Sequence, residues 1–219
     1  MIPVQKCYEN RFSKLGVDKR NKIWETLCKV YFQKFIKKSD VVMDLGAGYC
    51  EFINNIDCFK KYAVDINPDT KKYAKAGVTV IQKDASSLPD NLKNSVDVVF
   101  MSNFLEHLNS KDEVLEVILK AKNILKKGGR IMILQPNIDL VKEKYWDFFD
   151  HKTALNESSL GELMDIAGFK TEIFIKRFLP YSAAKNRFPT PPFIIRLYLA
   201  LPSLLRPLAG QSFIVANKK

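Results

Sequence analysis

Short apolar runs alternate with helical patterns along most of the chain. The runs VVMDL, YAVDI, TVIQ, VDVVFM and RIMIL occupy residues 41–45, 62–66, 79–82, 96–101 and 130–134. They are rich in valine and isoleucine, which is typical of parallel strands covered on both faces. Further strands are expected at 170–176 and 211–216. The alternation predicts an α/β fold built on a parallel sheet.

The segments between these runs carry helix signals. An amphipathic entry helix is predicted over 18–38, because its apolar residues recur with a helical period and lysines lie between them. Asn67, Pro68 and Asp69 predict a helix start. Ser110 and Glu113 predict a capping box ahead of an apolar stripe that ends before Gly128. A further helix is expected over 159–167.

Length and charge suggest one domain with a basic extension. The 219 residues suffice for one α/β domain, which we assign to 40–219, after a basic helical segment at 1–39. The net charge is +11 and lies at the ends, because residues 1–40 hold ten Lys/Arg against four Asp/Glu and residues 170–219 hold nine against one. Charged residues interrupt the first twelve positions, where a secretory signal would be apolar, and the cysteines lack the Cys-x-x-Cys spacing of a zinc site or redox pair. Both features favour a cytoplasmic protein with reduced thiols.

The first strand runs into a glycine-bearing turn that predicts a nucleotide pocket. Gly46 and Gly48 let the backbone approach a ligand, and a helix start after them would offer free N–H groups. Dinucleotide-binding folds place a third glycine where this chain has Glu51, whose charge would repel a phosphate. Asp44 adds a second carboxylate. A cationic, phosphate-free ligand such as S-adenosylmethionine fits better.

This segment resembles the class I S-adenosylmethionine-dependent methyltransferases, of the small-molecule type, over roughly residues 40–176. The resemblance implies a doubly wound, seven-stranded, mostly parallel Rossmann-like sheet with an antiparallel last strand, and S-adenosyl-L-homocysteine as product. Asp65 matches the acid that accepts the ribose hydroxyls, and Asp84 matches the acid that reads the adenine amine. The implied cofactor-binding residues are Asp44, Gly46, Ala47, Gly48, Asp65, Ile66, Asp84, Ala85 and Asn103.

The two histidines are the candidate catalytic residues. His107 follows the fourth strand and His151 follows an aromatic stretch, and a histidine can take a proton near neutral pH. In that stretch Trp146 and Phe149 are predicted to bind the acceptor. The segment ending at His107 resembles the Glu-x-x-Glu-His metal-binding stretch of certain O-methyltransferases, but Asn103 replaces the first Glu. We therefore assign no metal.

An apolar and basic insertion is predicted at 177–210, between the last two strands. Its apolar run is too short to span a bilayer, but it could contact a membrane surface through 188–207 or cover an amphiphilic acceptor. The favoured function is methylation of a small or amphiphilic acceptor: glycan- or lipid-linked, or a natural product. The alternatives are a nucleic-acid methyltransferase, suggested by the basic ends, and a non-catalytic cofactor-binding protein. Neither the acceptor atom nor the oligomeric state can be read from the sequence.

Overall fold

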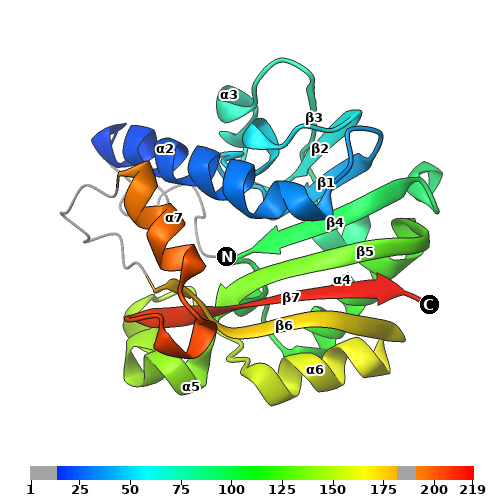
Figure 1. Ribbon diagram of the computed structural model, residues 1–219. Helices are drawn as coiled ribbons and strands as arrows, with labels where there is room; N and C mark the ends of the chain where they lie inside the picture. The colour runs from blue at the N-terminus through cyan, green and yellow to red at the C-terminus, as the bar shows by residue number, and fades with distance from the viewer. Residues whose placement is uncertain (1–13, 182–190) are drawn as a thin grey trace.

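The computed structural model describes residues 14–181 and 191–219, which form one seven-stranded sheet in the order β3-β2-β1-β4-β5-β7-β6 (Figure 1). The strands are β1 (Val41–Leu45), β2 (Lys60–Val64), β3 (Val78–Ile81), β4 (Val96–Ser102), β5 (Leu125–Pro136), β6 (Phe169–Pro180) and β7 (Ala209–Lys218). The strands from β1 to β5 pair in parallel. Strand β7 is antiparallel to β5 and β6. The predicted fold class is confirmed.

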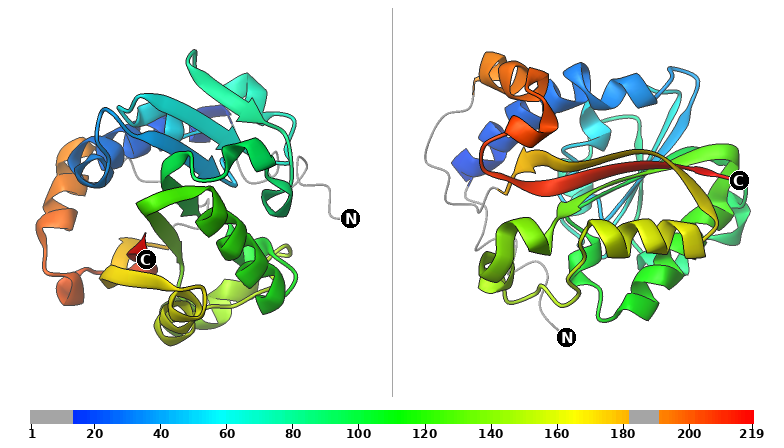
Figure 2. Two further views of the ribbon diagram at one scale, coloured as in Figure 1. Left: turned by 90° about the vertical axis from the view of Figure 1, so that its right-hand side faces the viewer. Right: turned by 60° about the horizontal axis from the view of Figure 1, so that its bottom comes forward.

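Helices cover both faces of the sheet (Figures 1 and 2). The main helices are α2 (Lys14–Val30), α4 (Lys111–Ile124), α6 (Glu157–Ile166) and α7 (Pro192–Ala200), and the shorter ones include α3 (Thr70–Tyr73), α5 (Ile138–Val141), η1 (Phe32–Phe35), η2 (Ile53–Asn55), η3 (Ala85–Ser87), η4 (Asp90–Leu92), η5 (Leu105–His107), η6 (Lys142–Asp147) and η7 (Ser203–Leu205). Met43 and Leu45 of β1 pack toward α4 and α6, whereas Val42 packs toward α2. Successive strand residues point to opposite faces, so a strand buried on both faces reads as a continuous apolar run.

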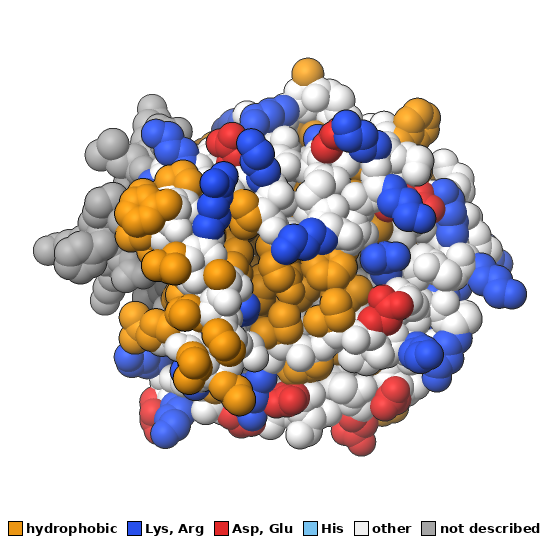
Figure 3. Space-filling model, in the orientation of Figure 1, with side chains coloured by type: hydrophobic (Ala, Val, Ile, Leu, Met, Phe, Trp, Pro, Cys, Tyr) orange, Lys and Arg blue, Asp and Glu red, His pale blue; other side chains and the backbone are white. Residues whose placement is uncertain are grey.

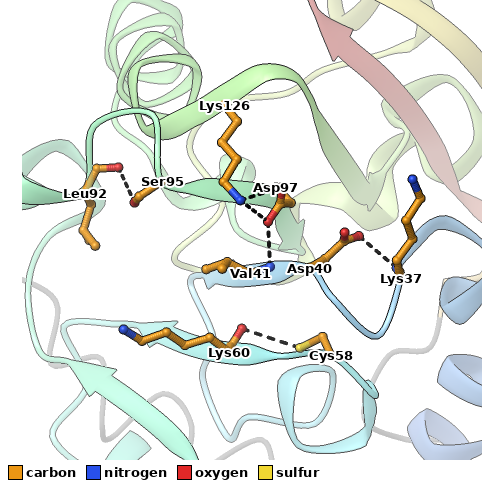
Figure 4. A network of polar contacts seen from close by, with 9 residues as sticks. All are labelled: Lys37, Asp40, Val41, Cys58, Lys60, Leu92, Ser95, Asp97 and Lys126. Atoms are coloured by element: carbon orange, nitrogen blue, oxygen red, sulfur yellow. Dashed lines mark hydrogen bonds and ion pairs between the residues drawn. The ribbon is translucent and has the colours of Figure 1, made fainter.

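The amino ends of the central strands are fixed by a polar network (Figure 4). Asp97 Oδ2 of β4 accepts a hydrogen bond from the backbone N–H of Val41 at 2.8 Å. Lys126 Nζ donates to both carboxylate oxygens of Asp97, at 2.9 and 2.7 Å. This network holds β1 and β4 at the end of the sheet opposite to the predicted pocket.

Two of the predicted helices are much shorter in the structure. After Gly48 the chain forms only η2, because Asn54 and Asn55 donate side-chain hydrogen bonds to the backbone oxygens of Tyr73 and Glu51, both at 2.8 Å. Such bonds compete with helix formation. The helix expected at 67–69 is the four-residue α3. The entry helix ends at Val30 and continues only as η1.

The predicted insertion is shorter at both ends, since β6 extends to Pro180 and β7 begins at Ala209. Within it, α7 packs against α2, and Ile195 is buried in the core on that face. Residues 188–190 of the segment expected to contact a membrane lie outside the described residues. Among the helices of the described part, none has the length and apolar character needed to cross a membrane.

Candidate active site

The predicted cofactor residues lie at the carboxyl ends of four neighbouring parallel strands. Gly46 follows β1, Asp65 follows β2, Asp84 comes shortly after β3 and Asn103 follows β4. The strand order reverses at β1, with β2 and β3 on one side and β4 and β5 on the other. In open α/β sheets, ligands bind outside the strand ends at this reversal. The structure therefore brings these residues to the end of the sheet where a ligand is expected.

The glycine turn is attached to the end of β2. The N–H groups of Gly46 and Ala47 donate to the backbone oxygen of Val64 at 2.9 and 3.1 Å, and Gly48 N–H donates to Asp65 Oδ2 at 2.7 Å. Gly46 has a φ of 71°, and a Cβ there would lie 2.5 Å from the Phe104 ring. The turn therefore requires glycine at position 46.

Asp65 is a buried carboxylate held in a fixed orientation. Its Oδ2 accepts from Gly48, and its Oδ1 accepts from the backbone N–H of Asn67 at 2.8 Å. Burial raises the pKa of Asp65, while its backbone hydrogen bonds and the nearby His107 lower it. Each carboxylate oxygen has about two acceptor sites. Asp65 can therefore accept two further donors, such as neighbouring hydroxyl groups.

Asp44 and Glu51 make the base of the turn acidic. Asp44 is buried, and its pKa is raised well above the usual range by burial and by the charges of Glu51 and Asp65. Burial also raises the pKa of Glu51, which Arg20 of α2 offsets through an ion pair at 2.5 Å. This pairing was not predicted from the sequence. A cation bound nearby would stabilise the ionised form of Asp44.

The side of the site near β3 combines a polar and an apolar surface. Asp84 caps η3, and its Oδ1 accepts from the N–H and the hydroxyl of Ser86 at 2.8 and 2.7 Å. Ala85 is buried, whereas the Ile66 side chain is 49% exposed. An exposed aliphatic side chain next to Asp65 suits the flat face of a ring such as adenine.

Asn103 connects the site to the last strand. It adopts a left-handed φ of 48°, and its Oδ1 accepts a hydrogen bond from Gln211 Nε2 at 2.8 Å. Gln211 belongs to β7 and was not identified from the sequence. Its polar side chain at the start of an otherwise apolar strand was the only available signal, and nothing local indicates that β7 lies beside β5.

The two histidines lie side by side within an aromatic cluster. Their ring centroids are 5.1 Å apart. His107 Nδ1 lies 3.4 Å from Asp150 Oδ2 and 3.2 Å from the Asp150 backbone oxygen. Phe148 and Tyr145 each contact the His151 ring, with centroids 4.9 Å apart. Asp150 can hold the Nδ1–H of His107, which leaves Nε2 able to accept a proton.

Two further predictions concern this cluster. Trp146 and Phe149 are 55% and 88% exposed. The aromatic rings that contact His151 belong to Tyr145 and Phe148. The role of Trp146 and Phe149 in binding the acceptor therefore stays a prediction. Glu106, His107 and His151 offer ligand atoms within 4.8 Å of one another, which could hold a metal ion. Our assignment of no metal rests on Asn103 and likewise stays a prediction.

The sheet order and the site at the carboxyl ends of its strands define a Rossmann-like methyltransferase class of fold. Residues 43–133 match the family model of a methyltransferase domain. No curated protein sequence matches the chain. The chain is therefore similar to the methyltransferase domain family over residues 43–133 and has the class I methyltransferase fold over its described residues. It is an enzyme that uses S-adenosylmethionine and yields S-adenosylhomocysteine.

Solved structures show the same fold at low sequence identity. A Thermotoga maritima S-adenosylmethionine-dependent methyltransferase, described as a possible histamine N-methyltransferase, has a TM-score of 0.67 and 18% identity, with 98% of this chain and 99% of that one covered. An Archaeoglobus fulgidus methyltransferase has a TM-score of 0.61 and 20% identity, covering 91% and 94%. A Methanosarcina mazei methyltransferase has a TM-score of 0.60 and 15% identity, covering 86% and 97%.

Proposed function

We propose that this enzyme methylates a small amphiphilic acceptor and that the residues at the strand ends bind its cofactor. In this proposal Asp65 accepts the ribose hydroxyls, and Asp84 accepts from the adenine amine with Ala85 beside it. Ile66 lies against the adenine ring, and Asp44 balances the positive charge. The turn of Gly46, Ala47 and Gly48, together with Asn103, surrounds the methionine part. The observation that carries the proposal is the hydrogen bond between Gly48 and Asp65, which joins the turn to the ribose acceptor.

His107 is the proposed general base, with His151 beside it. The cofactor supplies a methyl group already activated by its sulfonium, so the protein mainly orients the acceptor and removes its proton. His107 ends η5, which follows β4, so it comes from the same end of the sheet as Asp65, which follows β2. The bound cofactor would supply the methyl group, and His107 Nε2 would take the proton that the acceptor atom gives up.

The nature of the acceptor is inferred from the surroundings of the site. Aromatic rings enclose the histidines, and Phe148 also contacts the Tyr181 ring, with centroids 6.0 Å apart. Gln211, which donates a hydrogen bond to Asn103, lies three residues after the largely exposed Leu208. Apolar side chains around a few polar groups are typical of sites for small apolar ligands. An acceptor with a polar reactive end and an apolar body matches these surroundings.

Labelled methyl transfer tests the cofactor site and the acceptor class together. The enzyme is incubated with cell extract and S-adenosylmethionine labelled in the methyl group, and the extract is then partitioned between organic solvent, protein and nucleic acid. We expect label in the organic phase. Asp65→Asn should abolish it and weaken S-adenosylhomocysteine binding by about 100-fold, because hydrogen bonds to a charged acceptor are lost.

The exposed Asp165→Asn on α6 is the matched control and should behave as the wild type. Label in the nucleic acid would show that the nucleic-acid alternative is correct. Cofactor binding without label in any fraction would support the non-catalytic alternative. Normal cofactor binding by the Asp65→Asn variant would contradict the assignment of the ribose acceptor.

A further inference from the structure

Large apolar side chains gather on the exposed side of the segment between β6 and β7. We call this region the α7–η7 surface, and it comprises Phe193, Ile194, Leu197, Leu204, Leu205 and Leu208. Figure 3 shows hydrophobic side chains concentrated over α7, with Lys and Arg side chains beside their upper part and both basic and acidic side chains along their lower edge. Single exposed apolar residues are ordinary, but a contiguous group marks an interaction site.

Helix α7 is apolar on both its packed and its exposed side. Ile195 is buried, with Leu199 partly buried one turn later. Phe193 and Leu197 lie one turn apart on the opposite side and are 67% and 64% exposed. A helix at the surface of a protein that contacts only water normally has a polar outer face. Packing on α2 therefore accounts for one side of α7 and leaves the other side unexplained.

The exposed leucines after α7 are held on a rigid support. Arg206 is buried, and its guanidinium donates hydrogen bonds to the backbone oxygens of Leu199 and Leu201 at 3.0 and 3.2 Å, and of Phe178 at 3.3 Å. The guanidinium also lies over the Phe178 ring, 5.6 Å from its centroid. These contacts fix η7 against β6. Leu208 adopts a left-handed φ of 57° and is 85% exposed, a conformation that is costly for leucine.

Basic side chains outnumber acidic ones beside the α7–η7 surface, where α2 also exposes Glu25. Residues 191–208 contain Arg196 and Arg206 and no Asp or Glu. Helix α2, against which α7 packs, exposes Lys22 and Lys29, and Lys34 is exposed in η1 just after it. Basic residues beside exposed leucines and phenylalanine are typical of segments that lie in the interface of an anionic membrane.

We infer that the α7–η7 surface docks the enzyme on an anionic lipid membrane as a peripheral protein. Lipid is the favoured occupant because leucine and isoleucine dominate the surface, whereas leucine is under-represented among residues that dominate protein–protein binding. The nine residues of α7 can lie in an interface but are too few to span a bilayer.

Docking would place the active site next to the lipid. Leu208 is separated by only three positions from Gln211, which hydrogen-bonds Asn103 at the carboxyl end of β4. Three extended residues span about 10 Å. Figure 1 shows α7 at the end of the sheet toward which β4 points. The inference stands independently of the acceptor, but it explains how an amphiphilic molecule could reach the site from the membrane.

Vesicle sedimentation tests the inference with the full chain and no acceptor. Vesicles of phosphatidylcholine alone are compared with vesicles that contain about one third phosphatidylglycerol. We expect binding to the anionic vesicles, with an affinity about 100-fold lower for Phe193→Ser/Leu197→Ser, because each side chain contributes about tenfold when buried in lipid. Arg196→Gln should lower binding to anionic vesicles about fivefold and leave the zwitterionic case unchanged.

Ile166→Ser is the matched control, because Ile166 is 64% exposed on α6, on the opposite face of the sheet. It should bind vesicles as the wild type does. Unchanged S-adenosylhomocysteine affinity in all variants separates this result from any failure of the proposed function. Vesicle binding that Phe193→Ser/Leu197→Ser leaves intact would overturn the inference. So would a wild-type dimer in sedimentation velocity that binds no vesicles and that this double substitution dissociates, because the surface would then contact a second copy.

Discussion

At the residue scale, proton removal depends on how His107 is held. Asp150 faces its Nδ1, so Nε2 is the nitrogen that can accept a proton. His107→Gln keeps a polar side chain but cannot act as a base. We expect kcat to fall by about 100-fold, the low end for general base catalysis. His107 is assigned to the acceptor and not to the cofactor. The affinity for S-adenosylhomocysteine, measured by calorimetry, should therefore change by less than about twofold.

Two controls distinguish a base from a metal ligand. Asp150→Asn should lower kcat by about tenfold with Asp150→Glu recovering part of it, as expected for a residue that positions His107. Dialysis against a chelator should leave kcat of the wild type unchanged. If chelation abolished turnover and Mn²⁺ or Zn²⁺ restored it, then Glu106, His107 and His151 would be ligands, and the proposed role of His107 would be wrong.

Individual site residues could be predicted where chain position alone determines their place. Asp65 and Asp84 follow parallel strands, so their arrival at the same end of the sheet follows from the topology. The pairing of Glu51 with Arg20 and of Asn103 with Gln211 could not be predicted, because each joins elements distant in the sequence. Cys50 shows a similar limit, because it holds a left-handed φ of 61°, a conformation that favours glycine and that its residue type does not predict.

At the element scale, a single arginine secures the connection between β6 and β7. Arg206 donates to the backbone oxygens of Leu199, Leu201 and Phe178 in hydrogen bonds that are partly or fully buried. Arg206→Ala should lower the free energy of unfolding by about 3 kcal/mol, since several buried acceptors lose their donor. Guanidinium denaturation measures this change, and limited proteolysis within 192–200 should become faster.

Arg196→Ala is the control for that prediction, because Arg196 is exposed on α7. This substitution should change the free energy of unfolding by less than about 0.5 kcal/mol. Equal stability of the two variants would show that Arg206 does not hold α7 in place. In that case the apolar surface of α7 would not be rigidly supported.

The strands that are buried on both faces were the elements that could be predicted best. All seven strands were predicted, and apolar runs marked the five parallel ones, since strands covered on both faces need apolar side chains at most positions. The helix after Gly48 was wrongly predicted, because Asn54 and Asn55 satisfy backbone groups from their side chains. The extension of β6 to Pro180 was missed because Lys176 and Arg177 interrupt the apolar pattern.

At the scale of the whole molecule, the acidic and basic regions lie apart and suit ligands of opposite charge. The acids that surround the glycine turn are buried, and the excess of basic over acidic residues lies at the two ends of the sequence. A cationic ligand fits the first region and an anionic surface fits the second. The net charge of +11 therefore does not describe the active site.

The buried acids link folding, pH and cofactor binding in one testable relation. Burial raises the pKa values of Asp44, Asp65 and Glu51 in the folded enzyme above those of the unfolded chain. A raised carboxyl pKa contributes stability below the unfolded value, near pH 4, and this stability is lost as the pH rises through the folded value. Without cofactor, Asp44→Asn should therefore be more stable than the wild type, by a margin that grows from pH 5 to pH 8.

The cofactor should reverse that order. Its positive charge favours the ionised form of Asp44, so the stabilisation by saturating S-adenosylmethionine should increase with pH in the wild type and change little in Asp44→Asn. Denaturation at pH 5, 6, 7 and 8, with and without cofactor, measures both effects, and the exposed Asp165→Asn should follow the wild type. A cofactor-induced gain that is equal at every pH would mean that Asp44 does not balance the charge of the bound cofactor. The destabilising effect of the buried Asp44 on the free enzyme would then have to be explained by a role other than binding a cation.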